Sequence, residues 1–340
     1  VKLNFMDAQA HYNLGNLYDK AGELNKAEES YRQAIDLKQD YTLAYFNLGN
    51  SLNKSERFAE AELIYNKLII IKPDYAEAYN NLGNIQQKLK RLEEAEKNYR
   101  QAIKIKFDYY TAYFNLGLVL QQFFKIEEAI KCYRQVLALK PQYAEAHNNL
   151  GILLKLSDKI EEAETSYKNA ISIKQDYAEA FYNLGNLLQE IGRLEEAEFN
   201  LRKAISIRYN FAEVHNNLGG VLQQLGKLVE SEECYNQAII LKFDYVEAHR
   251  NLSLIKKYTT KDCQFKQMQK IYLEKSLSEE QLTHLTFGLA KASEDIGEIK
   301  QAFKYYTEGN FLRKKILKYN IDYDINLFND IKNNFPKFVK

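Results

Sequence analysis

Apolar and small residues recur along this chain with a period of 34 residues. A Leu–Gly pair opens each period, an alanine (Ser231 in the last period) follows twelve residues after the glycine, and an aromatic residue follows four residues later. The glycines are Gly15, Gly49, Gly83, Gly117, Gly151, Gly185 and Gly219, and the aromatic residues are Tyr31, Tyr65, Tyr99, Tyr133, Tyr167 and Tyr235, with Leu201 as the exception. Large and small apolar residues at such a period predict one pair of packed amphipathic helices per repeat.

Two details of the pattern predict how these helices pack and begin. Small residues let the two helices of a pair approach closely, and we expect the tyrosine to fill the gap against the next pair. Each pair then buries its apolar face by stacking on a neighbour, so the fold class is an all-α solenoid of antiparallel helix pairs. Asp74, Asp176 and Asp244 precede a glutamate by three residues. This is the spacing of a capping box, which predicts these aspartates as helix caps.

The 34-residue pattern resembles that of the tetratricopeptide repeat (TPR) family over residues 8–245, which form seven units. The resemblance implies a right-handed superhelical solenoid. A partial eighth unit, with Ser253 in place of the glycine, extends the predicted array over residues 1–257. Residues 258–340 are predicted to contain further helices that cap the solenoid and a linker toward another domain. A degenerate ninth hairpin in this region is indicated by Ala290, Gly297, Ala302, Tyr306 and Gly309.

The segment from Phe311 to Phe335 holds more apolar residues than a solvated tail needs, and we expect it to pack on something. Residues 249–259, 285–315 and 321–332 are similar to the connecting region of bacterial proteins that join TPR repeats to a sulfotransferase domain. That resemblance implies a sulfotransferase downstream. The chain itself has no glycine-rich phosphate-binding motif, so no donor-nucleotide site is assigned to it and no cofactor is predicted.

An asparagine recurs in the first helix of every unit, on the side away from the predicted core. These residues are Asn13, Asn47, Asn81, Asn115, Asn149, Asn183, Asn217 and Asn251. Helix propensity does not favour asparagine, and its amide offers both a donor and an acceptor to an extended peptide backbone. The file resembles the asparagine ladder of the O-linked N-acetylglucosamine transferases, which implies a place on the concave face. The alternative is that these asparagines bond neighbouring backbones and set the repeat geometry.

A second file of residues lies beside the ladder and changes character along the chain. It holds Asn16, Asn50, Asn84 and Asn186, but Leu118, Ile152 and Gly220 at the equivalent places. Lys20, Lys54 and Lys88 make the N-terminal part basic. Phe114, Leu118, Ile152 and Leu156 indicate either an apolar pocket that would give direction to a bound chain or ordinary packing between repeats.

Some TPR proteins hold a peptide carboxylate with a lysine at one position of the first helix. At the matching positions this chain has a basic residue only once, as Arg250. A carboxylate clamp is therefore disfavoured, although Arg250 alone is suited to pair with a carboxylate or phosphate.

Composition narrows the classes of function. With a formal net charge of +1, the chain has no overall positive potential that would attract nucleic acid or acidic lipid. Three scattered cysteines indicate a reducing compartment, and no apolar run approaches the roughly 20 residues that span a bilayer, so we expect a cytoplasmic protein. His11, His147, His215 and His249 share one position of different repeats and are interpreted as packing residues, which leaves no predicted metal site.

These observations predict a non-enzymatic module that binds an extended polypeptide or a protein partner. By resemblance, it recruits substrates or partners for a sulfotransferase. Two rival hypotheses are a stand-alone assembly scaffold, which binds a folded partner through its convex face, and the TPR part of a glycosyltransferase.

Overall fold

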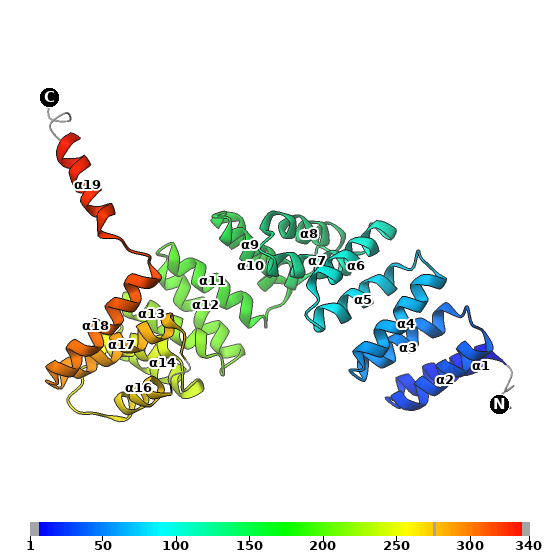
Figure 1. Cartoon of the computed structure of the whole chain (residues 1–340), viewed down its shortest axis with the longest axis horizontal. Helices are drawn as coiled ribbons and strands as arrows, with labels where there is room; N and C mark the ends of the chain where they lie inside the picture. The colour runs from blue at the N-terminus through cyan, green and yellow to red at the C-terminus, as the bar shows by residue number, and fades with distance from the viewer. Residues whose placement is uncertain (1–6, 275–276, 335–340) are drawn as a thin grey trace. The chain divides into compact units, whose positions relative to one another are not determined.

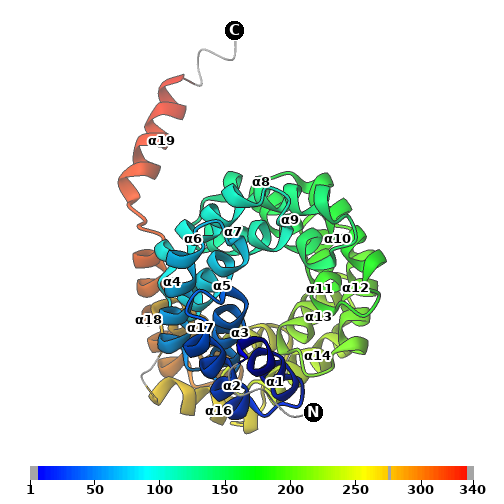
Figure 2. The ribbon, with the colours of Figure 1, turned by 90° about the vertical axis from the view of Figure 1, so that its right-hand side faces the viewer.

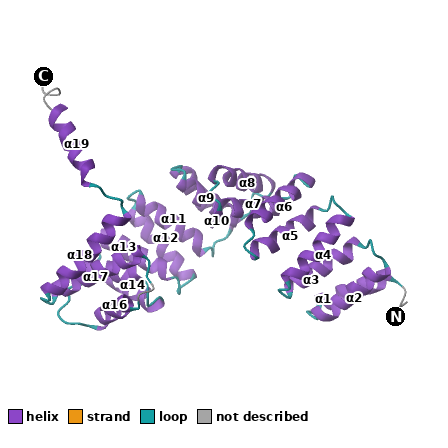
Figure 3. Ribbon diagram, viewed as in Figure 1, coloured by secondary structure: helices purple, strands orange, loops and turns teal. Residues whose placement is uncertain are grey.

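The computed structural model describes residues 7–274 and 277–334 of the chain, and all regular structure in these ranges is helical (Figure 3). The helices follow one another as antiparallel pairs, so the predicted all-α solenoid is confirmed. The chain divides into two compact units, Val1–Gln175 and Asp176–Lys340. The boundary predicted after residue 257 stays a prediction.

Unit 1 contains five repeats, each made of an odd-numbered first helix and an even-numbered second helix (Figure 1). The helices are α1 (Ala8–Lys20), α2 (Leu24–Leu37), α3 (Thr42–Lys54), α4 (Phe58–Ile71), α5 (Ala76–Lys88), α6 (Leu92–Ile105), α7 (Tyr110–Gln122), α8 (Ile126–Leu139), α9 (Ala144–Leu156) and α10 (Ile160–Ile173). In Figure 2, α5, α7 and α9 lie on the inner side of this unit's curve, and α6, α8 and α10 lie on the outer side.

Unit 2 continues the pattern for two repeats and then departs from it. Its helices are α11 (Ala178–Glu190), α12 (Leu194–Ile207), α13 (Ala212–Gln224), α14 (Leu228–Leu241), α15 (Val246–Ile255), α16 (Cys263–Leu273), α17 (Glu279–Asp295), α18 (Ile299–Ile316) and α19 (Ile321–Asn334). Helix α15 packs against α17, and α17 pairs with α18. The α17–α18 pair contains the residues from which a degenerate ninth hairpin was predicted, and Gly297 lies in its turn with a positive φ of 81°.

The repeat core is a close contact between the glycine of the first helix and the tyrosine of the second. A Cβ atom on Gly83 would lie only 2.7 Å from the ring of Tyr99, and one on Gly117 would lie 2.8 Å from Tyr133. Both tyrosine rings are fully buried. The tyrosine ring thus fills the gap inside its own hairpin, and its hydroxyl also contacts the next pair, where the amide nitrogen of Asn81 donates to the hydroxyl of Tyr65 at 3.2 Å. Glycine is needed here because any side chain would displace the ring.

The tight turn within each hairpin places one residue in the left-handed region. In three repeats this residue is a glycine, Gly22, Gly192 or Gly226, with φ near 78°. In the other four it is Glu56, Lys90, Phe124 or Asp158, with φ between 56° and 60°. Left-handed backbone costs an L-residue roughly 1–2 kcal/mol, so these four turns carry strain that the glycine turns do not.

The turns between repeats differ from the prediction at the helix caps. Helices α5, α11 and α15 are capped by Tyr75, Tyr177 and Tyr245, without a side-chain cap bond, rather than by the preceding aspartates. The tyrosine is needed for packing, and this displaces the capping-box register by one residue. The structure forms a capping box elsewhere, with Ser278 and Gln281 at the start of α17.

Three of the repeat histidines do more than pack. The Nε2 atoms of His147, His215 and His249 lie 3.0, 2.9 and 2.9 Å from the backbone oxygen six residues earlier, at Pro141, Tyr209 and Phe243 respectively. This hydrogen bond closes the turn that leads into each first helix. Burial lowers the pKa of each of these imidazoles and favours the neutral form, which donates from Nε2.

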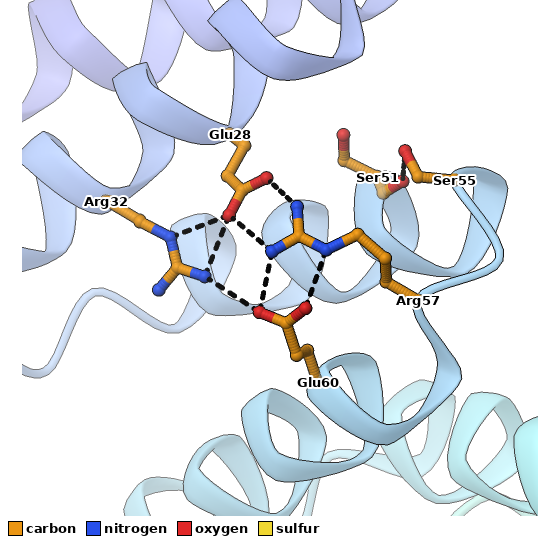
Figure 4. Close-up of polar contacts among 6 residues, drawn as sticks. All are labelled: Glu28, Arg32, Ser51, Ser55, Arg57 and Glu60. Carbon is orange, nitrogen blue, oxygen red and sulfur yellow. Dashed lines mark hydrogen bonds and ion pairs between the residues drawn. The ribbon is translucent and has the colours of Figure 1, made fainter.

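A file of ion pairs joins successive second helices, and Figure 4 shows its first member. Arg57, at the start of α4, bonds both Glu28 of α2 and Glu60 of its own helix, and Arg32 bonds Glu28 at 2.9 Å. The same positions form such clusters again at Glu96, Arg100, Lys125 and Glu128, and at Glu198, Arg202, Lys227 and Glu230. Acidic residues of the second helices therefore link one repeat to the next.

The tail does not pack as expected. Within the described residues, α19 shares no substantial interface with another helix, and its large apolar side chains are exposed. Residues 335–340 lie outside the described part of the chain.

Candidate functional site

The ladder asparagines lie on the first helices of both units. Unit 1 carries Asn13 on α1, Asn47 on α3, Asn81 on α5, Asn115 on α7 and Asn149 on α9, and unit 2 carries Asn183 on α11, Asn217 on α13 and Asn251 on α15. Asn13 is exposed and the others are half-buried. Of the second file, Asn16, Asn50 and Asn84 lie in unit 1 on α1, α3 and α5, and Asn186 lies in unit 2 on α11.

The two files are joined by hydrogen bonds between consecutive repeats. The amide nitrogen of Asn81 donates to Oδ1 of Asn50 at 2.9 Å, and the hydroxyl of Tyr65 donates to the same oxygen at 2.6 Å. The same arrangement occurs twice more in unit 1. Asn47 and Tyr31 donate to Asn16, and Asn115 and Tyr99 donate to Asn84, at 2.8–2.9 Å. In unit 2, Asn217 donates to Asn186 at 2.8 Å.

These contacts decide which atoms of the ladder can bind a ligand. The amide nitrogens of Asn47, Asn81, Asn115 and Asn217 donate to a side chain of the preceding repeat, rather than to the backbone that the alternative interpretation named. The oxygens of Asn81 and Asn217 accept bonds from Asn80 and Asn216. Within the described residues, Oδ1 of Asn47 and of Asn115 has no protein hydrogen bond, and neither has Nδ2 of Asn50 and Asn84. The surface therefore offers acceptors from the ladder and donors from the second file.

The C-terminal part of unit 1 replaces these clusters by apolar residues. Leu118 and Ile152 occupy the second file, and the nitrogen of Asn149 reaches only the hydroxyl of Tyr133, at 3.5 Å. Leu118 and Ile152 are partly exposed and Leu156 is 67% exposed, whereas Phe114 stacks on Tyr143 with ring centroids 4.9 Å apart. Phe114 thus contributes to packing between repeats, while the three aliphatic side chains remain available at the surface.

The position that holds a carboxylate-binding lysine in some TPR proteins has a structural role in this chain. Tyr12 and Phe46 stack on Tyr41 and Tyr75, the residues that begin the next repeat, with centroids 5.1 and 5.2 Å apart. Where the position is Asn80, its oxygen accepts a bond from Asn115 at 3.0 Å. Side chains engaged in this way cannot form a file of carboxylate donors.

A polar pocket of about 390 Å³ lies between the first helices of repeats 1 and 2. Both asparagine files line it, together with basic and acidic residues: Asn16, Asp19, Lys20, Tyr31, Asn47, Asn50, Asn53 and Lys54. Lys54 pairs with Oδ2 of Asp19 at 2.6 Å. Oδ1 of Asp19 is buried and has no hydrogen-bond partner among the described residues.

The other reactive groups of the chain do not form a site. Burial raises the pKa of the Cys132 and Cys234 thiols to about 11, so neither is a thiolate near neutral pH. Over residues 7–274 and 277–334, no group of His, Cys, Asp and Glu side chains is placed to hold a metal ion. No helix in these ranges has the length and apolar character needed to cross a bilayer.

Several structural residues were not identified from the sequence. Asp19 is one of them. The equivalent residues of the next two repeats are Asn53 and Gln87, so the repeat pattern does not mark this position as acidic. Its place in the pocket wall is visible only in the structure. The strained turn residues are others. Their signal was available, since Gly22, Gly192 and Gly226 fall on the same 34-residue period.

Comparisons with known proteins agree with this architecture. Models of the tetratricopeptide repeat match residues 8–41, 40–106, 74–142, 178–211 and 212–245, and a TPR repeat model matches residues 155–192. No curated protein matches the chain.

Among solved structures, YrrB, described as a TPR protein with an unusual peptide-binding site, is similar over 55% of this chain and 96% of its own, with 23% identity and a TM-score of 0.50. MamA is similar over 50% of this chain and 92% of its own, with 21% identity and a TM-score of 0.46. MamA from Desulfovibrio magneticus RS-1 is 18% identical, with a TM-score of 0.47 and coverage of 50% and 96%. The repeat models span both units, and the chain belongs to the tetratricopeptide repeat family.

Proposed function

We propose that the asparagine-lined face of unit 1 binds an extended polypeptide of a partner protein. The observation that carries this proposal is the polar pocket between repeats 1 and 2, which both asparagine files line. TPR repeats are protein-binding modules, and YrrB, a structural neighbour, is described as having a peptide-binding site. The partner is a polypeptide rather than nucleic acid because the chain has a net charge of only +1.

The bonding pattern suggests how the peptide is held. The free Oδ1 atoms of Asn47 and Asn115 accept backbone N–H groups, and the free amide groups of Asn50 and Asn84 donate to backbone carbonyls. These contacts do not depend on the side chains of the peptide. Because the ladder nitrogens are already bonded to the preceding repeat, the oxygens are held in place before binding, which reduces the ordering cost.

The apolar C-terminal part of the same face would determine in which direction the peptide binds. A peptide whose backbone lies along the asparagines reaches Leu118, Ile152 and Leu156, which are suited to an apolar side chain. We expect preferred peptides to carry one large apolar residue toward the end that lies at α7 and α9.

A peptide selected from a random displayed library against the full chain tests this proposal. Fluorescence anisotropy then gives its Kd for the wild-type chain and for the Asn47→Ala, Asn115→Ala double variant. We expect the double variant to weaken binding by at least tenfold, since each lost hydrogen bond is worth about 1 kcal/mol.

The matched control is Tyr99→Phe. This change removes the tyrosine bond to Asn84 and so loosens the same cluster, but it keeps Oδ1 of Asn115. Binding should be retained in this variant. If both variants weaken binding in parallel with a loss of thermal stability, the asparagines serve the repeat geometry and the proposed contacts are wrong.

The resemblance of residues 249–259 and 285–315 supports a narrower role, in which the module recruits substrates or partners to a sulfotransferase. This part rests on resemblance alone. The intact mass of the native gene product distinguishes the possibilities. A chain longer by a few hundred residues, with a phosphosulfate-binding loop, supports sulfate transfer. A sugar-nucleotide domain would indicate the glycosyltransferase alternative, and a native mass near 39.8 kDa would contradict a fused enzyme.

One observation favours the rival role as a scaffold for a folded partner. Helix α4 exposes Leu63 and Ile70, which are seven residues apart and therefore on one face, at 62% and 79%. Replacing both by serine should abolish partner capture under this hypothesis. The same change should leave binding of the selected peptide unaltered under the first.

A further inference from the structure

The last two helices of unit 2 each carry an exposed apolar stripe. Helix α18 buries one side, with Ala302, Tyr305, Gly309 and Leu312, in its pair with α17. The opposite side exposes Ile299, Phe303 and Phe311, and Phe303 is 73% exposed. Helix α19 exposes Ile321, Ile325, Phe328 and Ile331, which recur at helical spacing, and Phe328 is 70% exposed.

Helix α19 needs a partner to be stable. It has 14 residues, and helices of this length are marginal in water without packing. Among residues 7–274 and 277–334 it has no substantial interface with another helix. Two apolar stripes without cover, next to each other in the chain, mark an interaction surface rather than scattered surface residues.

The corner between α18 and α19 separates the two stripes within one chain. Lys318 has a φ of 48°, and the backbone nitrogens of Lys318 and Tyr319 donate to the carbonyls of Lys315 and Lys314, each at 3.1 Å. The nitrogen of Asp322 donates to Oδ1 of Asn320 at 3.0 Å, and the hydroxyl of Tyr319 bonds Asp324. The turns inside the repeat hairpins contain the same two backbone bonds, for example from Glu56 and Arg57, so these bonds do not by themselves prevent fold-back. In the structure, however, α18 and α19 share no substantial interface.

The stripes match each other in length and in charge. The α18 stripe runs from Ile299 to Phe311, a rise of about 18 Å, and the α19 stripe runs from Ile321 to Ile331, a rise of about 15 Å. The end of α18 and the turn that follows it expose Arg313, Lys314 and Lys318, whereas the first turn of α19 contains Asp322 and Asp324. Opposite charges meet when the two helices lie antiparallel.

We propose that two copies of this chain associate by exchanging α19, so that the α19 helix of each copy packs antiparallel on the α18 stripe of the other. The contact is two-fold and self-complementary, because each copy supplies one donor helix and one acceptor stripe. This site is independent of the peptide-binding face, which lies in unit 1. Dimerisation would bring two peptide-binding modules into one particle and raise the avidity for a partner with repeated motifs.

The mass of the full chain in solution tests the proposal. Light scattering across micromolar concentrations should give twice the 39.8 kDa of one chain. Phe328→Asp and Phe303→Asp, on the two sides of the proposed contact, should each give the mass of a single chain. The matched control is Asn329→Asp, a charge placed on the polar side of α19, which should stay dimeric. Circular dichroism should show that all three variants keep the repeat helices.

Cross-linking distinguishes exchange from fold-back. In a Cys263→Ser background, which removes the exposed native thiol, one chain carries Phe303→Cys and a second carries Phe328→Cys. A mixture of the two should form a disulfide between chains on oxidation. A single-chain mass at all concentrations, or a disulfide that forms only when both cysteines are in the same chain, would overturn the proposal.

Discussion

Repeats 1–3 and repeats 4–5 of unit 1 have the same helix lengths and the same Gly–Tyr core but differ beside the asparagine ladder. In repeats 1–3, an asparagine of the second file accepts bonds from a buried tyrosine and from the next repeat's ladder asparagine. In repeats 4–5, Leu118 and Ile152 replace that acceptor, and Asn149 retains only a long contact to Tyr133. One backbone thus carries a polar surface at one end and an apolar surface at the other.

The difference separates what holds the repeat together from what its surface offers to a ligand. The solenoid folds with either surface, so the amide clusters are not required for the fold. The first of them lines the polar pocket between repeats 1 and 2, which is the reason we propose a role in binding. The following predictions test this division, starting from the core that both regions share.

The largest effect should be the same in the two regions. Tyr99→Ala and Tyr133→Ala each remove a fully buried ring that contacts a glycine in the same hairpin, and each should cost about 3–5 kcal/mol. Chemical denaturation, with hydrogen exchange used to locate the affected repeats, measures the loss. A much smaller cost at Tyr133 would mean that the two regions differ in their cores as well as their surfaces.

Exchanging the second-file residues of the two regions should have an intermediate effect on stability, and the effect should differ between the regions. Asn50→Leu leaves the hydroxyl of Tyr65 without its acceptor and leaves the amide of Asn81 with only the hydroxyl of Tyr65, which should destabilise repeats 2 and 3 by about 1–3 kcal/mol. The reciprocal change, Leu118→Asn, provides an acceptor for Tyr133 and Asn149 and should be tolerated. Thermal unfolding compares the two variants. Equal destabilisation by both would show that the clusters are not a local property of repeats 1–3.

A smaller effect should come from the strained turns. Phe124 is 84% exposed with a φ of 56°, and Phe124→Gly should stabilise the fourth repeat by about 0.5–1 kcal/mol. The control is Gly22→Ala in the first repeat, where the left-handed backbone should make alanine destabilising. No change at either position in chemical denaturation would argue against the turn geometry described above.

The smallest effect should be a pH dependence of stability in repeats 4–5. Burial lowers the pKa of His147 in the folded state, so the unfolded chain takes up a proton first as the pH falls through the ordinary histidine value of about 6.5. Stability should therefore fall on acidification, and His147→Phe should reduce that slope. Tyr45 and Tyr79 occupy this position in repeats 2 and 3, which should show no corresponding change in hydrogen exchange. An unchanged slope in the variant would mean that other groups cause the loss.

The fold was predictable because each helix pair is specified by a local sequence pattern and this pattern is repeated. Seven Leu–Gly pairs on one period predict the helix pairs, and the structure places both residues as expected. The helix caps were not predictable from Asp74 because a tyrosine needed for packing displaced the cap by one residue. The tail was expected to pack because it is apolar, but a count of apolar residues does not show whether the cover comes from the same chain.

The candidate site was predictable as a set of residues but not as a set of available atoms. The period and the helical rotation indicate which asparagines share a face. They do not show that the nitrogen of Asn115 is bonded to Asn84 while its oxygen is free, because that depends on the distance between repeats. The pocket at Asp19 depends on the same distance.

The most direct test of the central claim is an N-methyl scan of the selected peptide, measured by fluorescence anisotropy against the wild-type chain and the Asn115→Ala variant. If the ladder oxygens accept backbone N–H groups, methylation of individual peptide nitrogens should weaken binding to the wild-type chain by about tenfold. At the nitrogen that faces Asn115, methylation should cause no further loss in the variant. Full tolerance of N-methylation, with affinity that follows only the peptide side chains, would contradict the account.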